Sequence, residues 1–175
     1  MIITGGKYKG RKVCVPDEKI TRPTLSKVRQ GVFNTLFSIL GDFQGKTFLD
    51  LFGGSGVMGL EALSRGFEEV TVFEKNLKVA QILKKNYSTL GLQPDLKIGD
   101  SLKLLGKLDK NFDVIYIDPP YYSGVYEEVF ELLGKYIQPT TIIIAEHSEL
   151  LDIEDFTLIK EKNYGGKRVS FFILQ

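Results

Sequence analysis

Apolar residues recur at two different spacings along the chain, and the spacing changes near Gly45. Residues 1–16 predict a short β-hairpin, with Ile2-Ile3 and Lys12–Val15 as arms around a glycine-rich turn. Between Thr24 and Leu40 apolar positions recur about every 3.6 residues, which predicts a helix with one apolar face and Thr24 as its cap. A hairpin and a helix therefore precede the rest of the chain.

After Gly45 short apolar runs alternate with longer helical patterns. The runs predict strands at 47–52, 69–74, 96–99, 112–118 and 140–145, and the helical patterns lie at 57–64, 77–90, from 101 onward and at 125–136. Residues 156–162 and 169–174 flank a Tyr-Gly-Gly turn and predict an antiparallel hairpin. We therefore expect one α/β domain over residues 1–175, with a seven-stranded, mostly parallel, Rossmann-like sheet covered by helices on both faces.

Composition narrows the class of protein. The chain is 43% hydrophobic and 26% charged, as in soluble globular proteins. Its longest apolar runs are too short to cross a bilayer, and its N-terminus lacks the layout of a signal peptide. The single cysteine, Cys14, cannot form an internal disulfide. These features predict a cytoplasmic protein without a membrane partner.

The net charge of +1 hides an uneven distribution. Residues 1–30 carry eight basic and two acidic side chains, whereas the other 145 residues carry 15 basic and 20 acidic ones. A basic segment on a mildly acidic body indicates a polyanionic partner, although a solvated basic hairpin explains the charge equally well. The candidate contacts in the hairpin are Lys7, Lys9, Arg11 and Lys12.

Ligands of open α/β sheets bind beyond the carboxyl ends of the strands. The first predicted strand ends in Asp50-Leu-Phe52-Gly53-Gly54-Ser55-Gly56, where glycines allow close approach to a ligand and the next helix offers free N–H groups. The run Gly54 to Gly59 also satisfies the dinucleotide pattern GxGxxG, so a nicotinamide enzyme and a plain tight turn are both alternatives.

The next two strand ends also carry acids. Glu74 follows the glycines by about twenty residues, the position of a carboxylate that binds ribose hydroxyls. Asp100, followed by Ser101, suits either an adenine amino group or a helix cap. Together these ends fit an adenosyl ligand, and Asp50 would repel a pyrophosphate but attract a cationic methionine group. The pattern favours S-adenosylmethionine over NAD.

The fourth strand leads into Asp118-Pro119-Pro120-Tyr121. The prolines fix two φ angles and remove two N–H donors, which leaves directed carbonyl acceptors beside the Asp118 carboxylate. Such acceptors suit an exocyclic amine, and Tyr121 offers a flat surface on which the same base could stack. As the amine attacks a methyl group, Asp118 can stabilise the positive charge that develops on nitrogen.

These motifs, together with ITGGKYKGRK and RPTLSKVRQGVFNTL, resemble the RsmD family over essentially the whole chain. The resemblance implies a class I methyltransferase that uses S-adenosylmethionine, releases S-adenosylhomocysteine, needs no metal and methylates N2 of a guanine in 16S ribosomal RNA. It implies that RNA as the substrate, free or within the assembling small subunit. We expect a monomer, because no long apolar surface pattern demands a dimer. The resemblance assigns the cofactor to Asp50, Phe52, Gly53, Gly54, Ser55, Gly56, Glu74, Lys75, Asp100, Ser101 and Asp118, the target base to Asp118, Pro119, Pro120 and Tyr121, and RNA entry to Arg22, Pro23 and Thr24.

The chain departs from the family pattern at two points. Its glycine loop reads FGGSG where FAGSG is common, a change that we expect only to loosen the turn. It reads VRQ where VRE is usual, so no carboxylate role is assigned at Gln30. The alternatives are a DNA adenine or cytosine amino-methyltransferase, a nicotinamide oxidoreductase and an RNA-binding module without turnover. His147 is expected in a surface loop.

Overall fold

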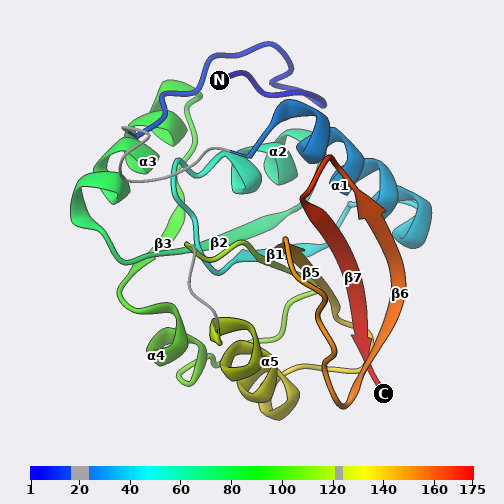
Figure 1. Cartoon of the computed structure of the whole chain (residues 1–175). Coiled ribbons are helices and arrows are strands. Elements are labelled where there is room, and N and C mark those ends of the chain that lie inside the picture. The colour runs from blue at the N-terminus through cyan, green and yellow to red at the C-terminus, as the bar shows by residue number, and fades with distance from the viewer. Residues whose placement is uncertain (17–23, 121–123) are drawn as a thin grey trace.

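The computed structural model describes residues 1–16, 24–120 and 124–175, and these ranges form a seven-stranded sheet between two layers of helices (Figure 1). The helices are α1 (Ser26–Leu40), α2 (Val57–Arg65), α3 (Leu77–Thr89), α4 (Ser101–Leu105) and α5 (Val125–Tyr136). The strands are β1 (Thr47–Asp50), β2 (Glu69–Glu74), β3 (Asp95–Ile98), β4 (Val114–Ile117), β5 (Ile142–His147), β6 (Phe156–Asn163) and β7 (Arg168–Leu174).

The order of the strands in the sheet is β3-β2-β1-β4-β5-β7-β6. Strands β1 to β5 are parallel, and β7 pairs antiparallel with both β5 and β6. The predicted mostly parallel sheet with a C-terminal antiparallel hairpin is therefore confirmed. The strand order reverses between β1 and β4, where Asp50 lies opposite Tyr116, so the carboxyl ends of these two strands open the crevice in which such folds bind ligands.

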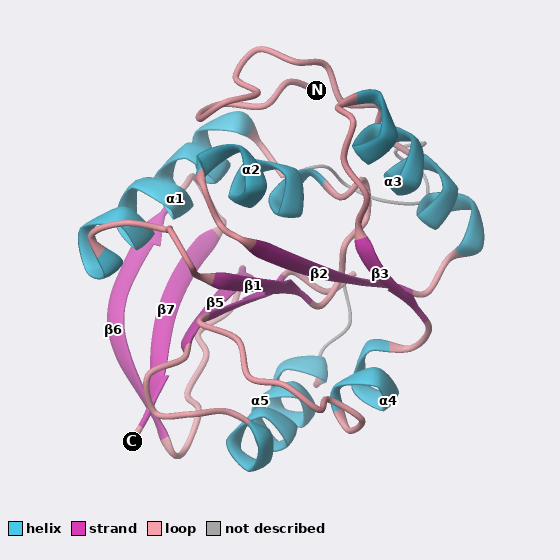
Figure 2. Cartoon of the chain, turned by 180° about the vertical axis from the view of Figure 1, so that it is seen from behind, coloured by secondary structure: helices cyan, strands magenta, loops and turns pink. Residues whose placement is uncertain are grey.

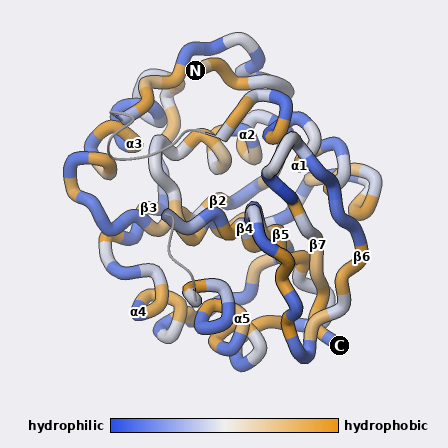
Figure 3. The backbone as a smooth tube through the Cα atoms, in the orientation of Figure 1, coloured by the Kyte–Doolittle hydropathy of each residue, from blue (hydrophilic) through white to orange (hydrophobic). Residues whose placement is uncertain are grey.

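Helices cover both faces of the sheet. Helices α1, α2 and α3 lie on one face, and α4 and α5 lie on the other (Figure 2). Alternate residues of each strand point into the two layers, so that Phe48 and Val72 belong to one core while Leu49 and Phe73 belong to the other. The central strands β4 and β5 are buried along their whole length, whereas much of the outer strand β6 is exposed and hydrophilic (Figure 3).

The predicted N-terminal hairpin (residues 1–16) is a loop closed by one antiparallel bridge between Ile2 and Lys12, and it lies over α2 (Figure 1). Its tip is bound to the last turn of α2, where Lys7 N donates to Ser64 O at 2.6 Å and Tyr8 N donates to Ser64 Oγ at 2.9 Å. Its return arm reaches α3, where Cys14 N donates to Asn86 Oδ1 at 2.8 Å. The tip and the return arm of the hairpin are thus both fixed to the helical layer.

The first helix differs from its prediction in two ways. Leu25, not Thr24, precedes its first turn, and no side chain caps it. Leu25 lies within the predicted apolar repeat but is 65% exposed, while Arg29 is completely buried. The other predicted helices and strands begin and end within two residues of the observed ones. No helix in the described ranges is long and apolar enough to cross a membrane.

Candidate active site

Asp50 ends β1 at the point where the strand order reverses. It is 1% exposed, and its Oδ1 accepts a hydrogen bond from Phe52 N at 3.2 Å. The pKa of Asp50 is raised to about 7, mainly by burial and also by the nearby carboxylates of Asp118 and Glu74, against the lowering effect of that hydrogen bond. A neighbouring cation strongly stabilises the ionised form of a buried acid. The sequence predicts such a cation here, the methionine group of the cofactor.

The glycine loop that follows is packed on one side and open on the other. Gly53 N donates to Phe73 O at 2.8 Å, and a Cβ at Gly53 would lie 2.2 Å from Val72 Cγ1. Gly56 has φ of +76° and begins α2. A Cβ at Gly54 would meet nothing within 4 Å, so the loop presents its open side there. A ligand can approach the backbone at Gly54 without displacing a side chain.

Glu74 connects the ends of β1 and β2. Its Oε2 accepts from Gly54 N at 2.9 Å and its Oε1 accepts from Asn76 N at 2.7 Å. Burial raises the pKa of Glu74 in spite of these two hydrogen bonds. A carboxylate has about four acceptor positions, so Glu74 still has capacity for the two hydroxyls of a ribose.

At the end of β3, Asp100 caps α4 by accepting from Lys103 N, and it lies 3.3 Å from Lys75 Nζ. The helix-cap interpretation is therefore confirmed. Asp100 has further acceptor positions, and its contact with an adenine stays a prediction. Ser101 is buried, and its hydroxyl donates to Leu51 O. Ser101 thus ties α4 to the end of β1, next to Asp50.

Asp118 follows β4 and is oriented from two directions. Thr24 Oγ1 donates to Asp118 Oδ2 at 3.3 Å, and Lys167 Nζ lies 3.8 Å from Asp118 Oδ1. Lys167, in the turn between β6 and β7, also forms an ion pair with Glu146, whose side chain is completely buried at the end of β5. Glu146 is not among the residues predicted for the site, although an acid at the carboxyl end of a central strand is the signal that identified the other site residues.

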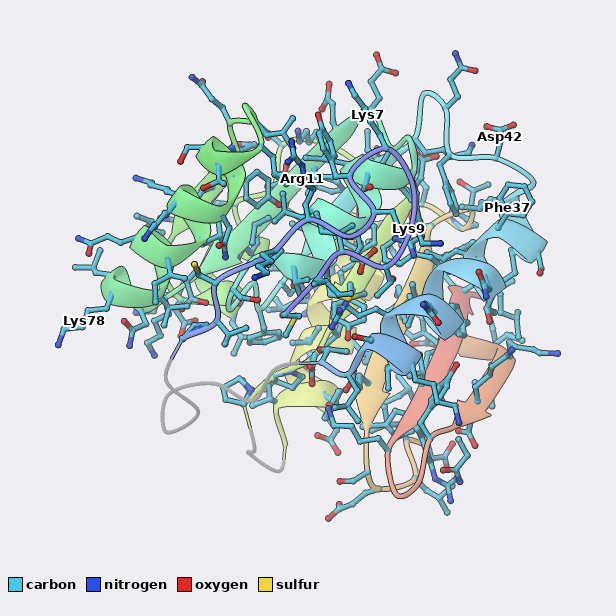
Figure 4. The ribbon with its side chains drawn as sticks, turned by 90° about the horizontal axis from the view of Figure 1, so that it is seen from above. Lys7, Lys9, Arg11, Phe37, Asp42 and Lys78 are labelled. Carbon is cyan, nitrogen blue, oxygen red and sulfur yellow. The ribbon has the colours of Figure 1, made fainter. Side chains whose placement is uncertain are left out.

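The structure separates some of the predicted site residues from this crevice. Lys7 is held at the last turn of the nine-residue helix α2, whose first turn adjoins the glycine loop, so about 13 Å of helix separates the hairpin tip from the site. Figure 4 shows Lys7, Lys9 and Arg11 on the hairpin over this helical layer; these residues and Lys12 are exposed. Arg22, Pro23 and Tyr121 lie outside the described residues.

The exposure of three further residues near the site bears on their predicted roles. Pro119 is half-buried and Pro120 is exposed. The expectation of a surface-loop histidine is wrong, because His147 ends β5, is 5% exposed and contacts Ser170 Oγ through Nε2 at 2.8 Å. Its position at the end of a buried strand explains the burial.

The described site gathers hydrogen-bond acceptors at the ends of β1, β2 and β3. Buried or half-buried carboxylates end β1 and β2, a third caps α4, and an open glycine backbone lies between the first two. This set fits the amino, hydroxyl and sulfonium groups of S-adenosylmethionine, and its three carboxylates would repel a pyrophosphate.

Comparison with known proteins gives matches over nearly the whole chain. The family described as Conserved hypothetical protein 95 matches residues 1–173. Ribosomal RNA small subunit methyltransferase D of Haemophilus influenzae is 35% identical over 173 residues, 93% of this chain and 88% of that protein. The Bacillus subtilis protein YlbH is 31% identical over 183 residues, 98% of each chain. The solved structure of yhhF from Escherichia coli has a TM-score of 0.86 at 29% identity and covers 100% of this chain and 98% of that one.

Proposed function

Since the chain belongs to the RsmD family, whose members include ribosomal RNA small subunit methyltransferases, we propose that it transfers a methyl group from S-adenosylmethionine to the N2 amine of a guanine in 16S ribosomal RNA. The coarser part of this statement follows from the family: the chain is an RNA methyltransferase. The acceptor cluster after β4 supports an amino group of a base as the target, and the choice of guanine N2 rests on the family resemblance. We further propose that residues 1–175 act as one methyltransferase domain.

The observation that carries the proposal is the adjacency of two acids at the point where the strand order reverses. Asp50 ends β1 and Asp118 follows β4, its neighbour in the sheet, and the Asp118 carboxylate is close enough to contribute to the raised pKa of Asp50. One acid faces the glycine loop and the other begins the Asp-Pro-Pro segment. A cationic methyl donor and an amine acceptor can therefore meet between two neighbouring strand ends.

S-adenosylmethionine supplies, when bound, an electrophilic methyl group on a positively charged sulfur. Asp50 and the open backbone at Gly54 would hold its methionine part, Glu74 its ribose and Asp100 the amino group of its adenine. Asp118 and the Pro119 carbonyl would accept the two N–H groups of the target amine. The Asp118 carboxylate would then stabilise the positive charge that develops on nitrogen, without acting first as a strong base.

The proposal is tested by replacing Asp118 with alanine. We expect Asp118→Ala to lower methyl transfer to RNA on the order of a hundredfold or more, because the amine loses its anionic acceptor. Binding of S-adenosylmethionine, measured by calorimetry, should stay within about threefold. The exposed acid Asp152 offers the control Asp152→Ala, which should retain full activity. Near-normal turnover by Asp118→Ala would overturn the assignment of Asp118.

A further inference from the structure

Thr24 lies beside the candidate catalytic aspartate although it is 94 residues away in the sequence. Its hydroxyl donates to Asp118 Oδ2 at 3.3 Å, and the residue is only 7% exposed. The sequence predicted that this hydroxyl caps α1, but no side chain caps that helix. The Thr24 hydroxyl thus bonds to a candidate active-site residue and does not cap α1.

The backbone at Thr24 is held by a buried arginine. Arg29, in the first turn of α1, donates from its guanidinium to the carbonyl of Thr24 and to the carbonyl of Ile2, the latter at 2.7 Å. Its Nε donates to Glu61 Oε1 of α2 at 3.0 Å, and both side chains are completely buried. Glu61 Oε1 also accepts from the backbone N and the hydroxyl of Thr4, at 2.8 and 2.9 Å.

A buried ion pair of this kind is a poor source of stability, because removing both charges from water costs about as much as their attraction returns. It does, however, fix the groups that it binds in one geometry. Here the fixed groups are the carbonyl of Thr24, the start of α1, the middle of α2 and the N-terminal hairpin. The position of the Thr24 hydroxyl is therefore set by a rigid part of the molecule.

Orientation of Asp118 matters because a carboxylate accepts well only along its lone-pair directions. Thr24 fixes one oxygen, and Lys167 Nζ lies 3.8 Å from the other. Lys167 is itself paired with the buried Glu146. Rotation of the Asp118 carboxylate is thus opposed from both sides before any substrate arrives.

We propose that Thr24 is a positioning residue for methyl transfer: its hydroxyl, held in place through Arg29 and Glu61, orients the Asp118 carboxylate toward the target amine. The proposal rests on the function proposed above, in which Asp118 accepts that amine. It differs from the RNA-entry role that the resemblance implies for Thr24, because an entry contact affects RNA binding whereas a positioning contact affects turnover.

The test replaces the hydroxyl while keeping the shape of the side chain. Thr24→Val should lower kcat on the order of tenfold, with the Kd for RNA and for S-adenosylmethionine within about twofold of wild type. Thr24→Ser, which retains the hydroxyl, should recover most of kcat. The matched control is Thr35→Val in the following helix α1, since the buried Thr35 hydroxyl has no hydrogen-bond partner among the described residues; this variant should keep full kcat.

Two outcomes would overturn the positioning role. One is an unchanged kcat in Thr24→Val; the other is a weaker Kd for RNA with kcat at saturation retained, which would return Thr24 to RNA entry. Either result, combined with loss of turnover in Asp118→Ala, would leave the proposed function intact. Absence of methyl transfer by the wild-type chain would instead count against the proposed function.

Discussion

The protonation state of a single residue, Asp50, affects both the stability of the fold and the attraction of the site for a cation. It is buried at the end of β1, close to the carboxylates of Asp118 and Glu74, and burial raises its pKa to about 7. Without a ligand the folded chain therefore retains a proton on Asp50 that the unfolded chain releases near pH 4. This contribution to the free energy of unfolding is complete at low pH and is lost as the pH rises through about 7.

Ligand binding should show the opposite trend. We expect the affinity for S-adenosylmethionine to rise as the pH increases through about 7, because only the ionised Asp50 attracts a cationic ligand. Asp50→Asn should bind more weakly and should flatten this rise, whereas the exposed control Asp152→Asn should behave as wild type. Calorimetry between about pH 6 and about pH 8 measures both effects. A rise of equal size in Asp50→Asn would exclude Asp50 as its source.

At the scale of elements, the turn from β1 to α2 is packed more tightly than its sequence indicates. The resemblance led us to expect that glycine at position 53, where alanine is common in the family, only loosens the turn. A Cβ on Gly53 would instead lie 2.2 Å from Val72 Cγ1 and 3.2 Å from Phe73 O. An alanine at position 53 would therefore press against Val72 on the neighbouring strand β2, a contact that no local pattern reveals.

Replacing Gly53 should consequently destabilise the chain. We expect Gly53→Ala to lower the free energy of unfolding by about 1–3 kcal/mol, measured by denaturant titration, because Val72 must move. In the double variant with Val72→Ala the loss should be smaller than the sum of the two single losses. The control is Gly134→Ala, where a Cβ has room and helix propensity improves. Additive losses would show that Val72 does not cause the strain.

The alternation of patterns was enough to predict the strands, most helices and the edge of the sheet that carries the acids. A local contact also explains the start of α3, where the side chain of Asn76 accepts from Lys78 N and Val79 N. What failed depends on contacts between distant segments. Thr24 resembled a cap but bonds to Asp118. Glu146 lies near a strand end like the other acids, but its ion pair with Lys167 of a later hairpin cannot be read from its position. Such pairings are fixed by topology and not by spacing.

For the whole molecule, the basic N-terminal hairpin and the candidate active site lie at different ends of α2. The hairpin tip is bound to Ser64, whereas its return arm reaches Asn86, whose Nδ2 also donates to Ser55 O in the glycine loop at 2.8 Å. RNA that contacts both places must extend along this face of the helical layer. The cations of the tip would then contribute to holding RNA and not to the chemistry.

Charge reversal at the tip tests this separation. We expect Lys7→Glu with Lys9→Glu to weaken RNA binding and to reduce its dependence on salt concentration, because two phosphate contacts are lost. The kcat at saturating RNA should be retained, since the site lies about 13 Å away along α2. Lys107→Glu, an exposed position after α4 on the opposite face, serves as the control. Unchanged affinity and salt dependence would identify the hairpin as merely solvated.

The identity of the methylated nucleoside tests the central claim most directly. The wild-type chain would be incubated with labelled S-adenosylmethionine and, separately, with ribosomal RNA, small ribosomal subunits and DNA, followed by digestion and chromatography of the nucleosides. The arrangement of Asp118 and the prolines after β4, in a chain of this family, predicts label in N2-methylguanosine from 16S RNA and none from DNA. Label in N6-methyladenine of DNA, or in a carbon-methylated base, would contradict the account.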